Sequence, residues 1–398
     1  MKIILSNKYY YPRGGDCVHV IALQKLLEEH GHEVAIFTMQ HPENLPSNYS
    51  RFWPSLLDYS SRNPGNLKES VLRPLFSKEV RNKWNDLLDK FKPNIVHLHN
   101  IHTQLSPIIA EEAWRRSIPV YWTLHDYKLI CPSYSFLRDG KVCEECLKDK
   151  KSVIKHRCIK GSLIGSLIGY LEAKKWSHAK LEKYTISFIS PSLFLKDKME
   201  EAGYLAAHIT QLYNFASTEK FKAITEKEDY YVYLGRISQE KGLNTLLEAA
   251  IRKPQYKLIV IGDGPMRSNL EKKYAANHID FLGFKPWIEI EQLLGKSKFM
   301  VISSEWYENN PLSIIESLAL GTPVLGAAIG GIPELINAEN GRLFKAGDIQ
   351  DLSNQISEMM TISDWNYQKI SASANIRFSS ENYYNELMSL YNKKIDNS

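Results

Sequence analysis

The chain of 398 residues carries 50 Lys and Arg against 45 Asp and Glu, a net charge of +5, and 43% of its residues are hydrophobic. This length predicts two large domains rather than one core, and the ordinary composition, without repeats or low-complexity tracts, excludes a disordered or repeat architecture. Residues 141–183 hold eleven Lys and Arg against five Asp and Glu. The basic surplus is therefore local, which argues against a nucleic-acid-binding protein.

In the first half of the chain, short apolar runs alternate with amphipathic segments. This rhythm predicts βαβ units and a parallel sheet. The spacing predicts a helix over residues 15–30. Strands are expected at residues 2–6, 33–38, 94–100, 119–125 and 187–192.

The same rhythm restarts near residue 215, and the tail at 379–394 reads as a helix. The fold class is therefore predicted to be α/β, with two Rossmann-like, doubly wound parallel-sheet domains facing a central cleft. Further strands are expected at 230–236, 256–264, 279–284, 299–304 and 322–327. The predicted domains are residues 1–214, with an insertion at 127–160, residues 215–378, and a C-terminal helix at 379–398.

Neither of the two most apolar segments is predicted to span a membrane. The run at the start of the chain is shorter than the core of a signal peptide, and residues 161–171 fall short of the roughly 20 apolar residues that a span needs. We expect a cytoplasmic protein that does not cross a membrane.

Several polar or glycine positions stand at the ends of predicted strands, where such folds bind ligands. Gly14 and Gly15 open the first helix, and His125 ends the strand at 119–125, where its imidazole could reach a sugar or phosphate oxygen. Arg236 and Lys241 bring two cations to the mouth of the second domain. The alternatives are a plain turn, a structural histidine and solvated surface charges.

Glu308 and Glu316 stand eight residues apart in "SEWYENNPLSIIESLALGTPV". The stretch predicts a helix with Asn310 as N-cap, Pro311 at the first helical position and Gly321 as the stop. Unpaired N–H groups at the start of this helix favour an anion, so a phosphate between two hydroxyl-binding carboxylates is one interpretation. Two solvated glutamates on an amphipathic helix are the other.

These motifs occur in order along nearly the whole chain and together resemble the retaining GT-B glycosyltransferases of glycosyltransferase family 4. The resemblance is carried by Gly14-Gly15, His125-Asp126, "GRISQEKG" (235–242), "IGDGP" (261–265), "FLGF" (281–284), the E-x7-E pair, "LGTPV" and "GGIPELI". It implies a hexosyltransferase without a catalytic metal or other catalytic cofactor. The departing diphosphate would then be stabilised by cations and helix N-termini, and would itself accept the proton of the acceptor.

The resemblance also implies roles for single residues. Glu308 would bind hydroxyls of the donor sugar, Glu316 the ribose, and Arg236 with Lys241 the diphosphate, while His125 would lie near the transferred sugar. His125, Glu308, Arg236 and Lys241 are thus the expected catalytic residues, and Asn309 stands where the family has glycine. The full donor-binding set is Gly14, Gly15, Arg236, Lys241, Gly264, Gly283, Phe284, Glu308, Asn309, Asn310, Pro311, Leu312 and Glu316.

The expected reaction moves a sugar from a nucleotide sugar, with a UDP-sugar favoured, to a saccharide or lipid-linked acceptor in surface-polysaccharide biosynthesis, such as O-antigen, capsule or exopolysaccharide. The alternatives are a GDP-mannose-dependent mannosyltransferase and a catalytically silent scaffold that binds nucleotide sugars. A nucleotide-dependent dehydrogenase is disfavoured because no G-x-G-x-x-G follows the first strand.

Four cysteines follow His125 with the spacing C-x11-C-x2-C-x11-C, while Cys17 stands apart. In a cytoplasmic chain this pattern favours a structural Zn2+ bound by thiolates, with His156 able to replace one ligand; free thiols or a redox pair are the alternative. The expected ligands are Cys131, Cys143, Cys146 and Cys158.

Residues 159–184 combine apolar side chains, Tyr170 and Trp176 with clustered lysines. Such a segment can lie at the surface of an anionic membrane, which predicts peripheral contact with the cytoplasmic face of the inner membrane. A buried helix with a solvated basic face is the other explanation.

Overall fold

A computed structural model describes residues 1–57, 69–216 and 221–395 of the chain. By internal contacts the chain divides into two compact units, and each is described by itself. The first unit comprises Met1–Arg138, Cys143–Tyr213 and Tyr384–Ser398, and the second comprises Asp139–Val142 and Asn214–Tyr383. The chain changes unit near residue 214, and the C-terminal segment from Tyr384 belongs to the first unit.

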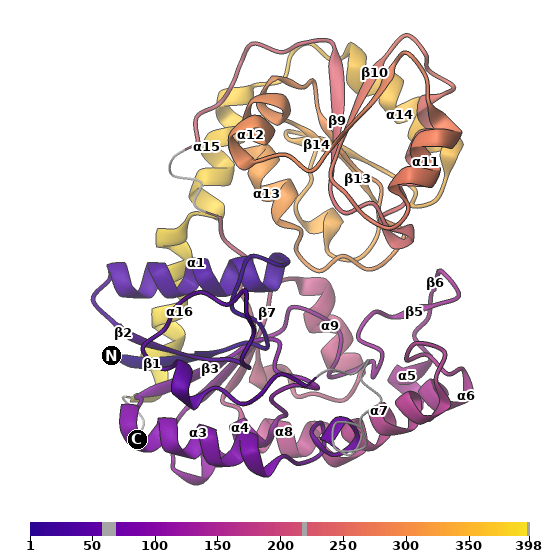
Figure 1. The fold of residues 1–398 in the computed structure, drawn as a ribbon. Helices are drawn as coiled ribbons and strands as arrows, with labels where there is room; N and C mark the ends of the chain where they lie inside the picture. The colour runs from indigo at the N-terminus through magenta and orange to yellow at the C-terminus, as the bar shows by residue number, and fades with distance from the viewer. Residues whose placement is uncertain (58–68, 217–220, 396–398) are drawn as a thin grey trace. The chain divides into compact units, whose positions relative to one another are not determined.

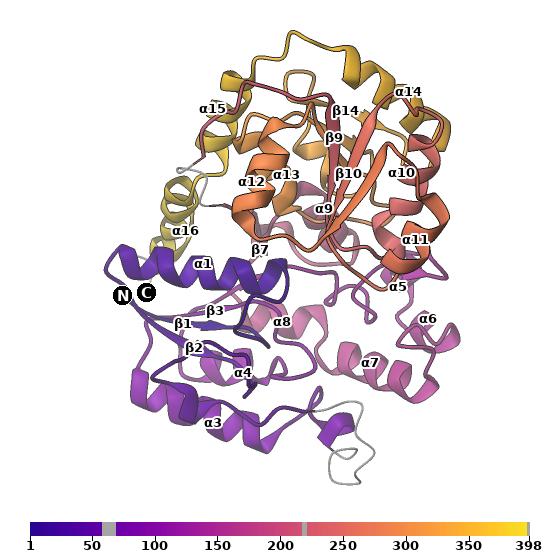
Figure 2. The same ribbon diagram turned by 45° about the horizontal axis from the view of Figure 1, so that its top comes forward.

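The first unit is built on a six-stranded sheet with the order β2-β1-β3-β4-β7-β8, in which every neighbouring pair is parallel. Helix α1 lies on one face of this sheet, and α3 and α4 lie on the other (Figures 1 and 2). The strands are β1 Lys2–Ser6, β2 Glu33–Phe37, β3 Ile95–Leu98, β4 Val120–Thr123, β7 Ser187–Ser190 and β8 Ile209–Gln211. The helices are α1 Gly15–Glu29, α3 Lys78–Phe91, α4 Ile108–Arg115, α7 Leu163–Lys175, α8 His178–Tyr184 and α9 Leu193–Glu201, with short 3-10 turns at Ser50–Phe52 and Ala206–His208.

The second unit repeats the architecture, with the strand order β11-β10-β9-β12-β13-β14 and parallel pairing throughout. The two sheets confirm the predicted α/β class with two Rossmann-like domains. The strands are β9 Tyr230–Leu234, β10 Lys257–Ile261, β11 Ile279–Gly283, β12 Met300–Ile302, β13 Val324–Ala327 and β14 Gly341–Phe344. The helices are α10 Leu243–Ala250, α11 Arg267–Tyr274, α12 Trp287–Lys296, α13 Leu312–Ala319, α14 Ile349–Thr361 and α15 Tyr367–Arg377, with 3-10 turns at Gln239–Lys241 and Ile332–Glu334.

The core of each unit is its sheet, because helices cover both faces and the strands can be apolar along their whole length. In β1 the side chains of Ile3, Ile4 and Leu5 are all fully buried, and in β10 Leu258 and Val260 are fully buried. This continuous burial explains why the strands were readable as short apolar runs rather than as an alternating pattern.

The insertion after β4 has little regular structure. It contains a two-stranded hairpin, β5 Leu137–Arg138 with β6 Lys141–Val142, and two four-residue helices, α5 Glu145–Lys148 and α6 Ser152–Lys155. The hairpin and the edge strands β8 and β14 were not predicted from the sequence. Their segments are too short or too polar to give a periodic signal.

The last helix, α16 Ser380–Ile395, ends the described chain against the first unit. The hydroxyl of Tyr384 lies 2.8 Å from His32 Nε2, and the hydroxyl of Tyr121 donates to the carbonyl of Leu390 at 2.9 Å. Within the described residues, no helix is both long and apolar enough to span a membrane.

Candidate functional site

The second unit contains a cavity of about 280 Å³ at the carboxyl ends of β9 and β12. Strand order reverses between these two neighbours, and open α/β sheets bind ligands at such a switch point. The lining comprises Tyr233, Leu234, Gly235, Lys241, Trp287, Ile290, Ile302, Ser304, Glu308, Pro311, Ser313 and Glu316. Two carboxylates and one ammonium group therefore share one cavity.

Glu308 is buried and held by a cation. Its Oε1 lies 2.6 Å from Lys241 Nζ and accepts a hydrogen bond of 2.6 Å from the Ser304 hydroxyl. Burial alone would raise the pKa of Glu308, but the Lys241 charge and hydrogen bonds from Lys241, Ser304 and Trp306 hold this pKa below its ordinary value. Glu308 is thus ionised and aimed as a hydrogen-bond acceptor, and is a poor general base.

The backbone of Glu308 is fixed by the glycine pair of "GGIPELI". Gly331 donates its N–H to the Glu308 carbonyl at 2.7 Å. Gly330 has a φ of 60°, and a Cβ there would lie 2.4 Å from the same carbonyl oxygen. Only glycine fits such a position. Asn309, which replaces the family's glycine, is not among the described residues with positive φ, so the loop accepts a side chain there without strain.

Glu316 belongs to α13, which begins at Leu312 with Pro311 in the N-cap position. The predictions that Asn310 caps this helix and that Pro311 is its first residue are both wrong. The Asn310 side chain instead accepts a 2.9 Å hydrogen bond from the Asn214 backbone N–H, because the extended backbone at Pro311 turns Asn310 away from the helix. Gly321, with a φ of 76°, follows the end of the helix as expected.

Glu316 differs electrostatically from Glu308 although both line the cavity. Burial raises the pKa of Glu316 to about 7, and within the part of the chain that the structure describes no charge offsets this effect. Hydrogen-bond donors on a ligand would stabilise the ionised form of this carboxyl group, and ribose hydroxyls are such donors.

The remaining predicted donor residues lie at strand ends of the second unit. Gly264 and Gly283 follow or end β10 and β11, and a Cβ at either position would lie within 2.5 Å of Ile237 O or Arg267 Nη1, respectively. Phe284 is 81% exposed, and Arg236 is also exposed. Neither Phe284 nor Arg236 lines the 280 Å³ cavity. Of the predicted donor-binding residues, Lys241, Glu308, Pro311 and Glu316 line it.

In the first unit, Gly14 is the N-cap residue of α1 and Gly15 is its first residue. A Cβ at Gly15 would meet nothing within 4 Å, and Gly14 is extended, with a φ of −167°. Backbone strain therefore does not require glycine here. What the pair provides is open space beside a helix N-terminus, which suits the approach of an anion.

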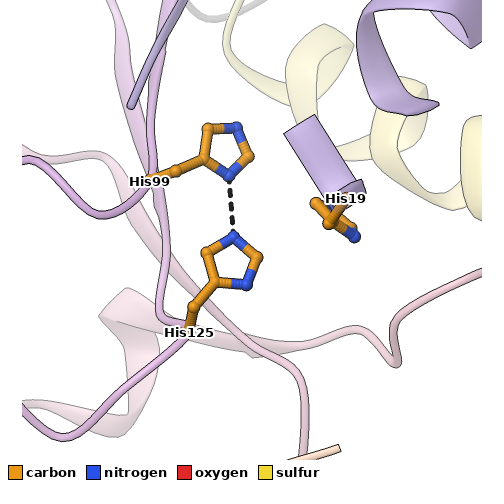
Figure 3. Close-up of side chains that lie close together, drawn as sticks. All are labelled: His19, His99 and His125. Atoms are coloured by element: carbon orange, nitrogen blue, oxygen red, sulfur yellow. Dashed lines mark hydrogen bonds between the residues drawn. The ribbon is translucent and has the colours of Figure 1, made fainter. Parts of the chain in front are cut away.

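His125 follows β4 and belongs to a cluster of histidines that was not predicted (Figure 3). His125 Nε2 lies 2.9 Å from His99 Nδ1, and the His19 ring, from α1, lies 5.0 Å from the His125 ring. The ligand nitrogens of the three histidines all lie within 4.8 Å of one another. The contact between His99 and His125 is a hydrogen bond in which one ring donates and the other accepts.

Burial lowers the pKa of His19, His99 and His125, and Asp16 only partly offsets this for His125. The three rings are therefore neutral near pH 7, and His125 can donate or accept a hydrogen bond without carrying charge. The sequence did contain a signal for His99, since "HLHN" at residues 97–100 also ends a predicted strand. His19 lies inside a helix and offered none.

The four predicted metal-binding cysteines lie in the first unit and are unbridged. Cys131 and Cys146 are buried, while Cys143 and Cys158 are half-buried. His156, the possible substitute ligand, instead lies 2.9 Å from a carboxylate oxygen of Glu145.

Comparison with known proteins decides the family. The model described as "Glycosyltransferase Family 4" matches residues 13–220, about half of the chain, and "Glycosyl transferases group 1" matches residues 215–376. The chain belongs to glycosyltransferase family 4. This membership confirms the family expected from the motifs and makes the protein a glycosyltransferase of group 1.

Two curated relatives of this family 4 glycosyltransferase extend over most of the chain. The sulfoquinovosyl transferase SQD2 of Arabidopsis thaliana is 24% identical over 84% of the chain, which spans 62% of the plant protein. N-acetyl-alpha-D-glucosaminyl L-malate synthase of Bacillus anthracis is 22% identical over 90% of the chain and 88% of its own length.

Among solved structures, Anabaena HepE in complex with UDP and glucose superimposes with a TM-score of 0.65. It is 18% identical, and the match covers 98% of each chain. At this identity the similarity shows a shared GT-B fold and nothing more.

Proposed function

We propose that the protein is a retaining glycosyltransferase that moves a sugar from a UDP-sugar to a lipid-linked saccharide in surface-polysaccharide or glycolipid biosynthesis. The observation that carries this proposal is the convergence of Lys241, Glu308 and Glu316 on one cavity at the switch point of the second sheet. A nucleotide sugar offers ribose hydroxyls, a diphosphate and sugar hydroxyls in that order, which these groups match in kind.

The proposed mechanism uses few protein groups. Lys241 has three N–H donors, of which Glu308 takes one, so the others are available to a diphosphate. Together with Arg236 it would stabilise the negative charge that develops as the sugar leaves. The diphosphate oxygen would accept the acceptor's proton on the same face of the sugar, so no protein base and no catalytic metal enter the step.

Glu308 would hold hydroxyls of the transferred sugar, because its ionised, buried carboxylate can accept hydrogen bonds but is too weakly basic to take a proton. Neutral His125 offers a hydrogen-bonding group for a sugar hydroxyl. Glu316 would bind the ribose, whose hydroxyls favour the ionised form of this carboxyl group.

A UDP-sugar is preferred over GDP-mannose as the donor because the similar HepE structure holds UDP. The relatives' names refer to different transferred groups, sulfoquinovosyl and N-acetylglucosaminyl, so they favour no particular sugar.

The proposal of a lipid-linked acceptor rests on α7. This helix exposes aliphatic residues and buries polar ones, the reverse of an ordinary surface helix. The carboxylate of the buried Glu172 forms an ion pair with the Lys128 ammonium group at 2.9 Å. Ser166 is a second polar residue on the buried face of α7. The exposed aliphatic residues, here called the α7 stripe, are Leu163, Ile164, Leu167 and Leu171, with exposed fractions of 52, 68, 44 and 39%.

Basic residues accompany the α7 stripe. Lys174 and Lys175 occupy the last turn of α7, and Lys180 follows in α8. Aliphatic side chains next to lysines are the composition with which helices lie in the interface of an anionic membrane. We therefore place the protein at the cytoplasmic face of the inner membrane, where a lipid-linked acceptor would be found.

Separate replacement of the two glutamates tests the donor site. Glu316→Ala should weaken binding of UDP and of the UDP-sugar by similar factors, about ten- to a hundredfold, because a hydrogen bond to a charged group contributes roughly 1.5–3 kcal/mol. Glu308→Ala should leave UDP affinity unchanged or higher, since Lys241 is released, while transfer falls by a similar factor. Calorimetry and initial rates measure the two quantities.

Glu289→Ala is the matched control, because Glu289 is an exposed acidic residue of the same unit that lies outside the cavity. If both cavity variants behave like Glu289→Ala in both assays, the two carboxylates have no part in donor binding and the proposed function fails.

A further inference from the structure

His99, which directly follows β3, is held from several sides within the first unit. Its backbone N–H donates to the Ser6 carbonyl at 2.9 Å, and its own carbonyl accepts a 2.8 Å hydrogen bond from Trp122 Nε1. Its ring stacks on the His97 ring, with 4.4 Å between the centroids and 25° between the planes. His97 is in turn hydrogen-bonded through both of its nitrogens. The His99 ring therefore has a fixed position and orientation.

His99 and His125 face each other through one nitrogen each (Figure 3). His99 Nδ1 lies 2.9 Å from His125 Nε2, and the planes of the two rings differ by 19°. His99 is fully buried, whereas His125 is partly exposed. A substrate can therefore touch His125 but not His99, and an effect of His99 on the reaction has to pass through His125.

The other nitrogen of His99 decides where the proton of this hydrogen bond lies. His99 Nε2 is buried, and no atom of the described residues forms a hydrogen bond with it. Buried N–H groups that lack an acceptor are rarer in native proteins than buried acceptors that lack a donor. The proton of neutral His99 is thus on Nδ1, from which it is donated to His125 Nε2. A neutral His125 then carries its own proton on Nδ1.

We propose that His99 is a positioning residue of this glycosyltransferase, which fixes His125 in the Nδ1–H tautomer. In this tautomer His125 offers an N–H donor to a sugar hydroxyl oxygen, because its one lone pair, on Nε2, is occupied by His99. His125 in this state takes no proton from an acceptor, in line with a reaction that uses no protein base. The tautomer itself does not depend on the donor, and only its use toward a sugar rests on the proposed function.

NMR spectroscopy of the full-length protein labelled with nitrogen-15 histidine tests the tautomer directly. The long-range proton–nitrogen cross-peaks of a neutral imidazole differ between the Nδ1–H and the Nε2–H form. The signals of His125 are those that His125→Gln loses. At pH 8 we expect the Nδ1–H pattern for His125 and for His99 in the ligand-free wild type. An Nε2–H pattern for His125 in the folded wild type would overturn the proposal.

Variants of His99 test whether this residue sets the tautomer. His99→Ala removes the donor, so His125 should change toward the Nε2–H form that a free imidazole prefers in water. His99→Asn keeps an N–H donor near the position of Nδ1 and should retain the Nδ1–H form in part. His19→Ala is the matched control, because the His19 ring lies 5.0 Å from the His125 ring in the same cluster, and it should leave the tautomer unchanged. A wild-type pattern in folded His99→Ala would show that His99 does not set the tautomer.

Initial rates and calorimetry with UDP separate positioning from packing. His99→Ala should lower kcat about tenfold, the factor that one lost hydrogen bond accounts for, and should leave UDP affinity unchanged. His99→Asn should recover most of this loss. Equal losses of kcat in the two variants would identify a packing role and contradict the positioning role. Failure of the wild type to bind UDP would instead count against the proposed function, and the NMR spectra would still decide the tautomer.

Discussion

Glu308 and Glu316 show how strongly environment separates two identical side chains in one cavity. Lys241 and Ser304 keep Glu308 ionised, whereas burial raises the pKa of Glu316 to about 7. In the proposed donor site, the two residues would therefore bind hydroxyl groups at opposite ends of the donor with different dependence on pH.

Donor affinity should rise with pH through Glu316. If only ionised Glu316 accepts the ribose hydroxyls, a pKa of about 7 makes binding of a UDP-sugar up to roughly tenfold tighter at pH 8 than at pH 6. Glu308 has a lowered pKa and stays ionised over this range, and the phosphates of a UDP-sugar do not titrate there. Calorimetry at both pH values measures the effect, and Glu316→Gln is expected to abolish it.

The same shift affects the stability of the ligand-free protein. The folded-state pKa of Glu316 lies above its ordinary value of 4.5, so its stabilising contribution is complete below that value and is lost as pH rises through about 7. Glu316→Gln should thus raise the melting temperature at pH 8 more than at pH 5. An equal effect at both pH values would show that Glu316 does not titrate in this range.

At the residue scale, the sequence predicted the site residues that stand at strand ends or at a helical spacing. The position of Glu316 on a helix and of Glu308 before it followed from the apolar stripe of α13. The pairing of Glu308 with Lys241, 67 residues away, followed from no local pattern. Nor did the hydrogen bond between Asn310 and Asn214, since contacts across the unit depend on tertiary packing.

Among the elements, α7 departs most from sequence-based expectation. Its sequence was compatible with either a membrane-surface segment or a buried helix. In the structure Glu172 is buried and the α7 stripe is exposed. The inward Glu172 is stabilised in a buried site by Lys128 and His102, which hold its pKa at about 2 against the effect of burial. Two partners distant in sequence thus fix which face of the helix is exposed.

Replacement of Leu163, Ile164 and Leu167 by Gln should weaken binding to anionic vesicles by more than tenfold, because each buried aliphatic side chain contributes about 1.5–3 kcal/mol. Lys174→Gln and Lys180→Gln should each weaken it by about fivefold, on the basis of about 1 kcal/mol per basic residue near such a surface. Vesicle sedimentation measures both effects.

Ile288→Gln serves as the control for the stripe, since Ile288 is 68% exposed but belongs to the second unit. Equal sedimentation of the wild type, the stripe variant and the control would show that the α7 stripe does not contact lipid. UDP affinity should be the same in all three proteins.

The strands that form the middle of each sheet were predictable because they are buried on both faces and therefore apolar throughout. The edge strands β8 and β14 were missed, as were the hairpin and short helices of the insertion. These elements depend on pairing with neighbours or on fixed loops rather than on their own composition.

At the scale of the whole molecule, the C-terminal helix joins the end of the chain to the first sheet. The buried Tyr391 hydroxyl lies 2.7 Å from His97 Nδ1, and His97 Nε2 lies 2.7 Å from the Thr123 hydroxyl. Burial lowers the pKa of His97 to about 3, so the ring stays neutral and both its nitrogens are hydrogen-bonded. The residues of this network are 294 positions apart, which no sequence pattern could reveal.

Tyr391→Phe should destabilise the first unit by about 1–3 kcal/mol, because it leaves a buried nitrogen of His97 without its partner. Denaturant unfolding measures this loss. Asn392→Ala, an exposed neighbour on the same helix, should have little effect. Identical unfolding of the two variants would show that the network does not contribute to stability.

The central proposal is that the second unit binds a nucleotide sugar through Glu316 and Lys241. Thermal unfolding of the wild-type protein with UDP, GDP and their sugar derivatives tests it most directly, because a ligand at a hundredfold its dissociation constant adds about 2.7 kcal/mol of stability. We predict that UDP and a UDP-sugar raise the melting temperature, and that Glu316→Ala loses this effect. A melting temperature that no nucleoside diphosphate or nucleotide sugar changes would contradict the claim.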